Sequence, residues 1–179
     1  MNNYLLSVDP SIKNTGFTLW DIKWCRGGCG KEIYHHHTPI WIKSFNFQKQ
    51  YDFYLEVKSK VHDLIEITRK ISKFNIVIER GTFHSKNGIG YETQEHLRGF
   101  IAGPFNKLIT KDMLISPSKL KSWYKENYKN ITIDYSNWKK EYSLILVKDL
   151  ITFNNWNITV NNHDEADSLL IGWYYLNKE

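Results

Sequence analysis

The chain has 179 residues and a mass of 21.3 kDa, which is enough for one domain with a complete core. Hydrophobic residues make up 41% and charged residues 24%, close to globular averages, so disordered and fibrous classes are excluded. No apolar run approaches the roughly 20 residues that a membrane-spanning helix needs. From the length, we expect a single domain over residues 1–179. Asp9 comes before any signal-peptide core could form, so we expect the protein in the cytoplasm.

The net charge of +5 is concentrated in about a quarter of the chain. Between Lys107 and Lys148, nine lysines stand against four acids, whereas the rest of the chain is balanced. A basic segment interleaved with aromatic residues suits a phosphate-rich partner, and a merely solvated lysine face explains the charge equally well. The interleaved aromatic residues are Trp123, Tyr124, Tyr128, Tyr135 and Trp138.

The first part of the chain predicts three strands. Tyr4–Val8 is an apolar run that ends in Asp-Pro, and Thr15–Trp20 alternates in strand style, so these two segments form a hairpin. Pro39–Phe47 resumes strand character. Before this third strand we predict a hairpin insertion at about residues 23–38, which contains cysteines, glycines and histidines.

The middle of the chain changes period. Tyr51–Ser72 has apolar residues at helical spacing, which predicts a long amphipathic helix. Phe74–Ile78 is a nearly continuous apolar run, which favours a strand in the centre of a sheet. Arg80–Tyr91 is expected to be a loop, and Glu92–Ile109 returns to helical spacing.

The last part of the chain predicts one short strand, at Met113–Ile115, followed by helices. Ser116 and Pro117 are a helix-start signal, because serine caps free amides and proline suits the first turn. Further helices are predicted at Tyr135–Phe153 and from near Asp164 to Leu176. Strands followed by alternating strands and helices predict an α/β fold, in which helices flank a mixed sheet.

Four acidic residues are placed where this fold would gather them. Asp9 ends the first strand, Glu79 ends the central strand, and Asp164 and Asp167 are three residues apart on one face of the last helix. Each has an ordinary explanation, as a turn residue, a solvated strand end or a first-turn helix acid. Together they predict a site, because the ends of neighbouring strands are where α/β sites form.

A cluster of carboxylates predicts metal-dependent chemistry. Close carboxylates repel one another unless a cation neutralises them, and hard oxygen ligands favour Mg²⁺ or Mn²⁺. Two such ions about 3.5 to 4 Å apart support in-line attack of water on a phosphodiester. The sequence therefore predicts hydrolysis of a phosphate ester.

The sequence resembles the RuvC-like Holliday junction resolvases of the RNase H-like superfamily. The resemblance rests on VDPSIKNTGF at Val8–Phe17, IVIER at Ile76–Arg80 and HDEADSLLIG at His163–Gly172, in this order along the whole chain. It implies an RNase H-like five-stranded mixed sheet flanked by helices, from a phage or bacterial source. It also implies two Mg²⁺ (or Mn²⁺) ions per active site, held by the catalytic residues Asp9, Glu79, Asp164 and Asp167.

The same resemblance implies a homodimer that cleaves four-way DNA junctions by paired nicks. Two equivalent sites suit a substrate with two-fold symmetry. Three features depart from the family pattern: Ser11 replaces a usual glycine, Phe83 is one residue further from Glu79, and the insertion has no common counterpart. The residues that the resemblance assigns to DNA binding, with lysines chosen as candidates, are Phe83, Lys86, Lys119, Lys121, Lys139, Lys140 and Lys148.

Further side chains could bind a metal or have only a structural role. Cys25, Cys29, His35 and His37 have sulfur and imidazole donors at the local spacing of a small zinc knuckle, and a plain hairpin with incidental histidines is the alternative. His163 either joins the metal site or caps the last helix. Glu165 is expected outside the metal site, because on a helix it faces about 100° away from Asp164.

Two other functions remain open at this point. An RNase H-like ribonuclease, or a less selective flap or fork nuclease, would keep the fold and change the substrate. A non-catalytic nucleic-acid-binding module would use the acids only structurally. Digestion of a junction, a fork and an RNA/DNA hybrid side by side separates the nucleases, and binding without metal-dependent turnover indicates the module.

Overall fold

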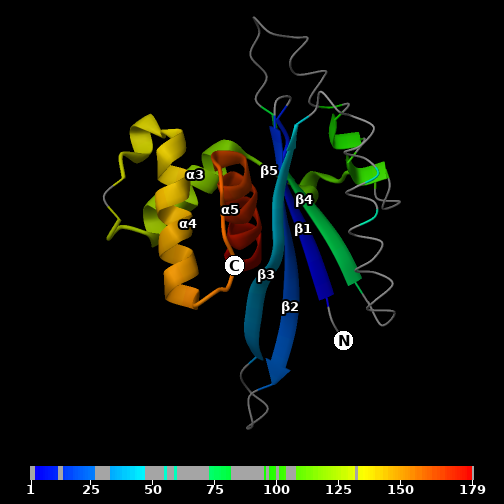
Figure 1. The fold of residues 1–179 in the computed structure, drawn as a ribbon, viewed down its shortest axis with the longest axis horizontal. Coiled ribbons are helices and arrows are strands. Elements are labelled where there is room, and N and C mark those ends of the chain that lie inside the picture. Colours follow the sequence, from blue (N-terminus) through cyan, green and yellow to red (C-terminus); the bar gives the residue numbers. More distant parts are fainter. Residues whose placement is uncertain are drawn as a thin grey trace, which may run out of the picture.

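Five strands form one mixed sheet in this computed structural model (Figure 1). They are β1 (Asn3–Asp9), β2 (Asn14–Arg26), β3 (Ile33–Asn46), β4 (Lys73–Glu79) and β5 (Leu114–Ile115). The order across the sheet is β3-β2-β1-β4-β5, with β1 antiparallel to β2 and parallel to β4. The structure describes residues 3–11, 14–26, 33–46, 55, 59, 73–81, 95, 97–99, 101–103, 108–131 and 133–178.

The β2–β3 hairpin is longer than predicted. The two strands pair continuously from Asn14↔Asn46 to Arg26↔Ile33, apart from one irregularity beside Trp20. The described parts of the predicted hairpin insertion, residues 23–26 and 33–38, are paired extensions of these two strands.

Three helices follow the sheet: α3 (Pro117–Asn127), α4 (Lys140–Asn154) and α5 (His163–Asn177). The prediction of one helix over Tyr135–Phe153 was wrong at its start. Residues 135–137 form a separate 3₁₀ turn, and α4 begins only at Lys140, after Lys139, whose backbone is extended. No helix among the described residues is long and apolar enough to cross a membrane.

Both predicted helices of the middle segment are helical where they are described. Leu55 and Ser59 are helical within the first, and residues 95, 97–99 and 101–102 within the second. The second prediction, Glu92–Ile109, was too long at its end, since residues 108–110 are not helical. The sequence of this stretch contains Pro104, and proline disfavours the continuation of a helix, so the prediction could have been shorter.

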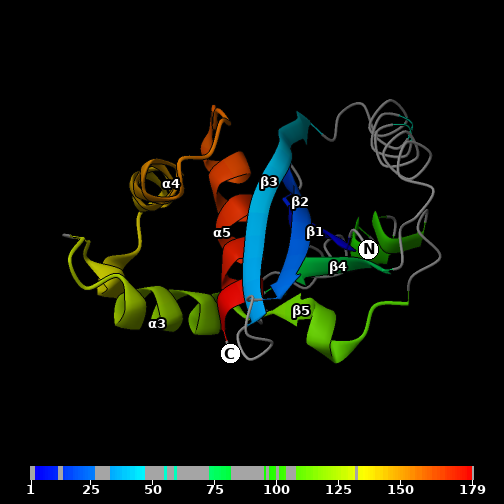
Figure 2. The same ribbon diagram turned by 90° about the horizontal axis from the view of Figure 1, so that it is seen from below.

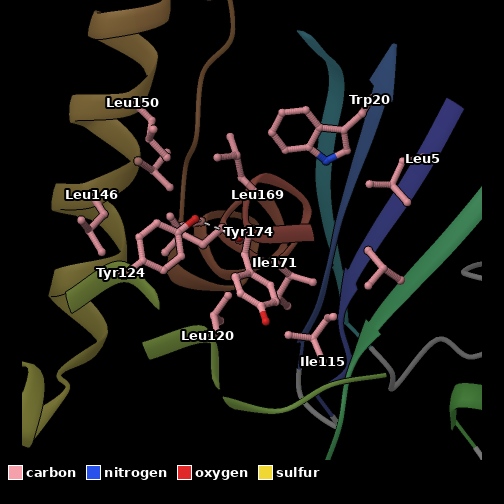
Figure 3. Packing of buried hydrophobic residues seen from close by; sticks show 14 of the residues in the cluster. Leu5, Trp20, Ile115, Leu120, Tyr124, Leu146, Leu150, Leu169, Ile171 and Tyr174 are labelled. Atoms are coloured by element: carbon pink, nitrogen blue, oxygen red, sulfur yellow. Dashed lines mark hydrogen bonds between the residues drawn. The ribbon is translucent and has the colours of Figure 1, made fainter. Parts of the chain in front are cut away.

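The sheet carries a core on each face. Side chains alternate along β1, so that Leu5 packs toward α5 and α4, while Leu6 and Val8 pack toward Leu97 and Ile101. Figure 2 shows α5 lying directly on the sheet with α4 outside it, and Figure 3 shows the leucine and aromatic side chains that fill this layer. Because α5 is covered by the sheet and by α4, most of its side chains are buried, as the sequence LLIG within it suggests.

Two glycines allow α5 to approach the sheet closely. A Cβ on Gly172 of α5 would lie 2.1 Å from the indole nitrogen of Trp20 and 2.5 Å from the hydroxyl of Ser7. A Cβ on Gly16 of β2 would lie 1.8 Å from the backbone oxygen of Asp164, in the first turn of α5. Only glycine fits at either position, so the start of α5 is fixed against β2.

Candidate active site

Asp9 and Glu79 end two neighbouring parallel strands. The register pairs Val8 of β1 with Ile78 of β4, so the next residue of each strand, Asp9 and Glu79, leaves the same edge of the sheet. Both side chains are half-buried. Beside Asp9, the buried Thr15 hydroxyl of β2 donates a hydrogen bond of 3.0 Å to the backbone oxygen of Ser11.

The start of α5 brings the second pair of acids to this edge. Gly16 lies opposite Asp9 in the β1–β2 register, and the backbone of Asp164 packs directly on Gly16. Asp167 follows one turn later on the same face of α5. The buried hydroxyl of Ser143 on α4 donates a short hydrogen bond to the Asp167 carboxylate, which ties α4 to the same place.

The electrostatics show that these acids share one environment. Burial raises the pKa of Asp9 well above its usual range, and the three other carboxylates raise it further. Burial, followed by the charge of Asp167, raises the pKa of Glu79 to about 7, against the opposing charges of Lys121 and Arg98. The structure therefore brings the acids predicted from the sequence within electrostatic range of one another.

Asp167 has a raised pKa for similar reasons. Burial raises it to about 6; the hydrogen bond from Ser143 opposes this rise, Asp164 adds to it, and the charges of His163 and Lys140 oppose it. Nearby cations thus offset only part of the negative charge. The remaining repulsion is what a divalent cation would relieve.

The donor set fits Mg²⁺ or Mn²⁺, since all four side chains offer carboxylate oxygens. As the side chains stand, no group of three or more histidine, cysteine, aspartate or glutamate residues in the described part of the chain is arranged to hold an ion. Asp9, Glu79, Asp164 and Asp167 are the residues that would hold the metal.

Two of the predicted lysines lie within electrostatic range of the acids. The charge of Lys121 on α3 lowers the pKa of Glu79, and that of Lys140, at the start of α4, lowers the pKa of Asp9 and of Asp167. The ammonium of Lys121 also lies 5.7 Å from the centre of the Trp138 ring, a cation–π distance. The other candidates are exposed or outside the described residues: Lys119, Lys139 and Lys148 are exposed, and Phe83 and Lys86 lie outside.

The aromatic residues of the basic segment pack against the core, and one of them, Tyr124, is fully buried in it. Tyr124 is fully buried, and its hydroxyl donates a hydrogen bond of 2.9 Å to the backbone oxygen of Leu170. The indole nitrogen of Trp173 donates to the hydroxyl of Tyr128 at 2.7 Å. Trp123, Tyr135 and Trp138 pack against the same core. These contacts give the aromatic side chains a structural role in the core beside α3 and α5.

Glu165 and His163 have local structural partners. The buried carboxylate of Glu165 accepts hydrogen bonds from the backbone nitrogens of Ser44, at 3.2 Å, and Asn161, at 2.7 Å, which holds α5 against β3. Asn162 caps α5 by accepting from the backbone nitrogen of Glu165 at 3.0 Å. Nδ1 of His163 lies 3.0 Å from the backbone oxygen of Lys140, so it links the starts of α4 and α5.

The zinc prediction falls largely outside what the structure describes. Cys29 lies outside the described residues. The backbone register pairs Cys25 with Tyr34, and it pairs His35 and His37 with Trp24 and Ile22. The zinc knuckle therefore stays a prediction.

Sequence reasoning missed Arg98, which lies behind Glu79. Its side chain is fully buried and donates from Nε to the backbone oxygen of Glu79 at 3.2 Å. The signal was present in the sequence as an arginine beside Leu97, on an amphipathic segment whose apolar face covers the sheet.

The fold is similar to solved structures of RuvC. The structure of Thermus thermophilus RuvC matches with a TM-score of 0.56 at 12% identity, over 96% of this chain and 94% of that chain. T. thermophilus RuvC in complex with a Holliday junction substrate matches with a TM-score of 0.53 at 10% identity, over the same shares of 96% and 94%. These likenesses confirm the RNase H-like fold class and the resemblance to RuvC at the level of the fold.

A third solved structure, Fowlpox virus resolvase with its Holliday junction DNA, has a TM-score of 0.45 at 18% identity, over 99% of this chain and 98% of that chain. No protein-family model matches the sequence, and no curated protein matches it.

Proposed function

We propose that this chain is a Mg²⁺-dependent endonuclease that cuts four-way DNA junctions. The observation that carries the proposal is the meeting of Asp9 and Glu79 with the start of α5, where the carboxyls raise the pKa of Asp9 together. Bound Mg²⁺ or Mn²⁺, two per site, would supply the Lewis acidity that activates water and stabilises the departing oxygen in phosphodiester hydrolysis.

The residues of the site then have separate tasks. Asp9 and Glu79, on the rigid strand ends, would set the position of the ions, and Asp164 and Asp167 would complete the ligand set from α5. Ser143 would keep the Asp167 carboxylate turned toward the site through its hydrogen bond. In other proteins, hydrogen bonds to a metal-binding side chain orient it toward the ion in the same way.

Cationic side chains would hold the DNA backbone next to the acids. Lys121 and Lys140 are the best-supported candidates, because their charges reach Glu79, Asp9 and Asp167. Lysines bind phosphate as point charges and carry no base information, so they suit a substrate recognised by its shape.

The four-way junction is the proposed substrate because the fold is that of RuvC, and one of the similar RuvC structures contains a Holliday junction. Two subunits related by a two-fold axis would place one site on each of two equivalent strands, which gives paired nicks. The homodimer is part of this proposal. The competing substrates are a fork, a flap and an RNA/DNA hybrid.

The test is cleavage of a synthetic four-way junction during a Mg²⁺ titration, with the fork, the flap and the hybrid in parallel. We expect the junction to be cut fastest and no cutting in EDTA. Asp9→Asn should reduce the cleavage rate by more than about 100-fold, because it removes a ligand charge, and should leave junction binding intact. Asp149→Asn is the matched control, since this carboxylate is exposed on α4.

Two results would contradict the proposal. Normal cutting by Asp9→Asn in Mg²⁺ would remove the acidic site from the mechanism. Faster cutting of the RNA/DNA hybrid than of the junction would assign the chain to a ribonuclease.

A further inference from the structure

A buried arginine stands directly behind the end of β4. Leu97 and Ile101, four residues apart on one helical segment, pack with Ile76 and Ile78 of β4 on the face of the sheet opposite α5. This packing holds Arg98 at the end of the strand. Its side chain has no exposed surface.

Arg98 contacts the backbone of the strand end and one acid of its own segment. Nε donates a hydrogen bond of 3.2 Å to the backbone oxygen of Glu79, and Nη1 forms an ion pair with Glu95. Nη2 is buried and has no hydrogen-bond partner among the described residues. The guanidinium thus uses its planar fork to span Glu95 and Glu79, which a lysine ammonium cannot reproduce.

The backbone around Glu79 is held from two sides. The next residue, Arg80, donates from its backbone nitrogen to the oxygen of Ile115 in β5 at 2.7 Å. Arg98 holds the carbonyl of Glu79 itself. Together these bonds fix the orientation of the single peptide group between Glu79 and Arg80, which directly follows the Glu79 side chain.

Packing does not explain why a guanidinium is used here. Burying a charge is costly, and an apolar side chain of similar volume often stabilises a core equally well. The neighbouring positions of the segment do use apolar side chains, Leu97 and Ile101. What the guanidinium adds over an apolar side chain is donors that reach the carbonyl of Glu79 and the carboxylate of Glu95.

We propose that Arg98 is a positioning residue for Glu79: by holding the carbonyl at the end of β4 and keeping a positive charge behind it, Arg98 prepares Glu79 to bind a divalent cation. The inference rests on the proposed function. It gives a role in the metal site to a residue that need not touch metal or DNA.

Three variants separate positioning from general stability. Arg98→Met removes the charge and the donors and keeps much of the length. Arg98→Lys keeps the charge without the planar fork. Tyr124→Phe is the matched control, because it removes a buried hydrogen bond, to the oxygen of Leu170, from the core on the other face of the sheet.

The direct readout is Mn²⁺ binding to the DNA-free protein, measured by isothermal titration calorimetry. We expect Arg98→Met to bind Mn²⁺ about 10- to 100-fold more weakly than the original chain, as for other residues that orient metal ligands. Arg98→Lys should fall between the two. Tyr124→Phe should unfold at a lower temperature and bind Mn²⁺ normally.

Junction cleavage gives a second readout. Raising the Mg²⁺ concentration should restore much of the rate of Arg98→Met, because the lost step is ion binding, and junction affinity in EDTA should not change. If Arg98→Met does not fold, the comparison of Arg98→Lys with Tyr124→Phe decides: weaker Mn²⁺ binding by Arg98→Lys alone supports the inference.

The failures are distinguishable. Suppose that the original chain binds Mn²⁺ and cuts the junction, and that folded Arg98→Met binds Mn²⁺ equally strongly. This result overturns the inference and leaves the proposed function intact. If Arg98→Met is unfolded, a Mn²⁺ affinity of Arg98→Lys equal to that of the original chain overturns the inference as well. An original chain that neither binds Mn²⁺ nor cuts overturns the proposed function together with the inference.

Discussion

The carboxyls of Glu79 and Asp167 hold protons more tightly than ordinary acids do. Burial is the largest cause for both, and it moves the pKa of Glu79 from 4.5 to about 7 and that of Asp167 from 3.8 to about 6. Between the ordinary and the raised values, the folded chain keeps protons that the unfolded chain has released. The free energy of unfolding therefore falls as pH rises through this window.

This linkage predicts a pH dependence of stability without metal. In EDTA, the free energy of unfolding should fall between about pH 4 and pH 7, with at most roughly 3 to 4 kcal/mol from Glu79, since one pKa unit corresponds to about 1.4 kcal/mol. Urea unfolding at several pH values measures it. Glu79→Gln should have a shallower fall than the original chain, and Mg²⁺ should restore stability above pH 7. If the free energy of unfolding falls equally steeply with pH in the two proteins, the pKa of Glu79 is not raised by its surroundings.

At the scale of elements, the contact between β2 and α5 controls the site. Gly16 lies opposite Asp9 and leaves room for the backbone of Asp164, so one close approach joins both halves of the acidic set. The sequence motif contained this glycine beside Thr15, and only the structure supplies the reason for it. The opposite case is Tyr124, which lay in a basic, aromatic sequence and is core, because periodicity alone cannot tell which partner covers an aromatic helix face.

Substitution of Gly16 tests this contact. In Gly16→Ala the new Cβ would lie 1.8 Å from the Asp164 oxygen, a backbone atom that cannot turn away, so α5 must shift. We expect a loss of about 1 to 3 kcal/mol in the free energy of unfolding and a strong loss of junction cleavage. Gly99→Ala is the control, because nothing lies within 4 Å of its Cβ and the residue is helical. A Gly16→Ala variant as stable and active as Gly99→Ala would contradict the predicted contact.

At the scale of the whole molecule, the sequence predicted the acids better than their surroundings. Asp9 and Glu79 end apolar strands and Asp164 lies in the first turn of a helix, so local patterns were enough to predict that these acids lie near one another; that they form one site stays a prediction. Arg98 acts through a contact between segments that the sequence separates by 19 residues, and no local pattern encodes that contact. The lysines were predicted as a group. Among them, Lys121 and Lys140 stand out in the structure, because the charge of Lys121 lowers the pKa of Glu79 and that of Lys140 lowers the pKa of Asp9.

Diffraction from crystals soaked in Mn²⁺, recorded for its anomalous signal, tests the central claim most directly. We predict Mn²⁺ bound by at least three of the four carboxylates of Asp9, Glu79, Asp164 and Asp167, at oxygen distances of about 2.1 Å, as for similarly small hard cations. Mn²⁺ found only elsewhere, with these four side chains still apart at a saturating concentration, would contradict the account.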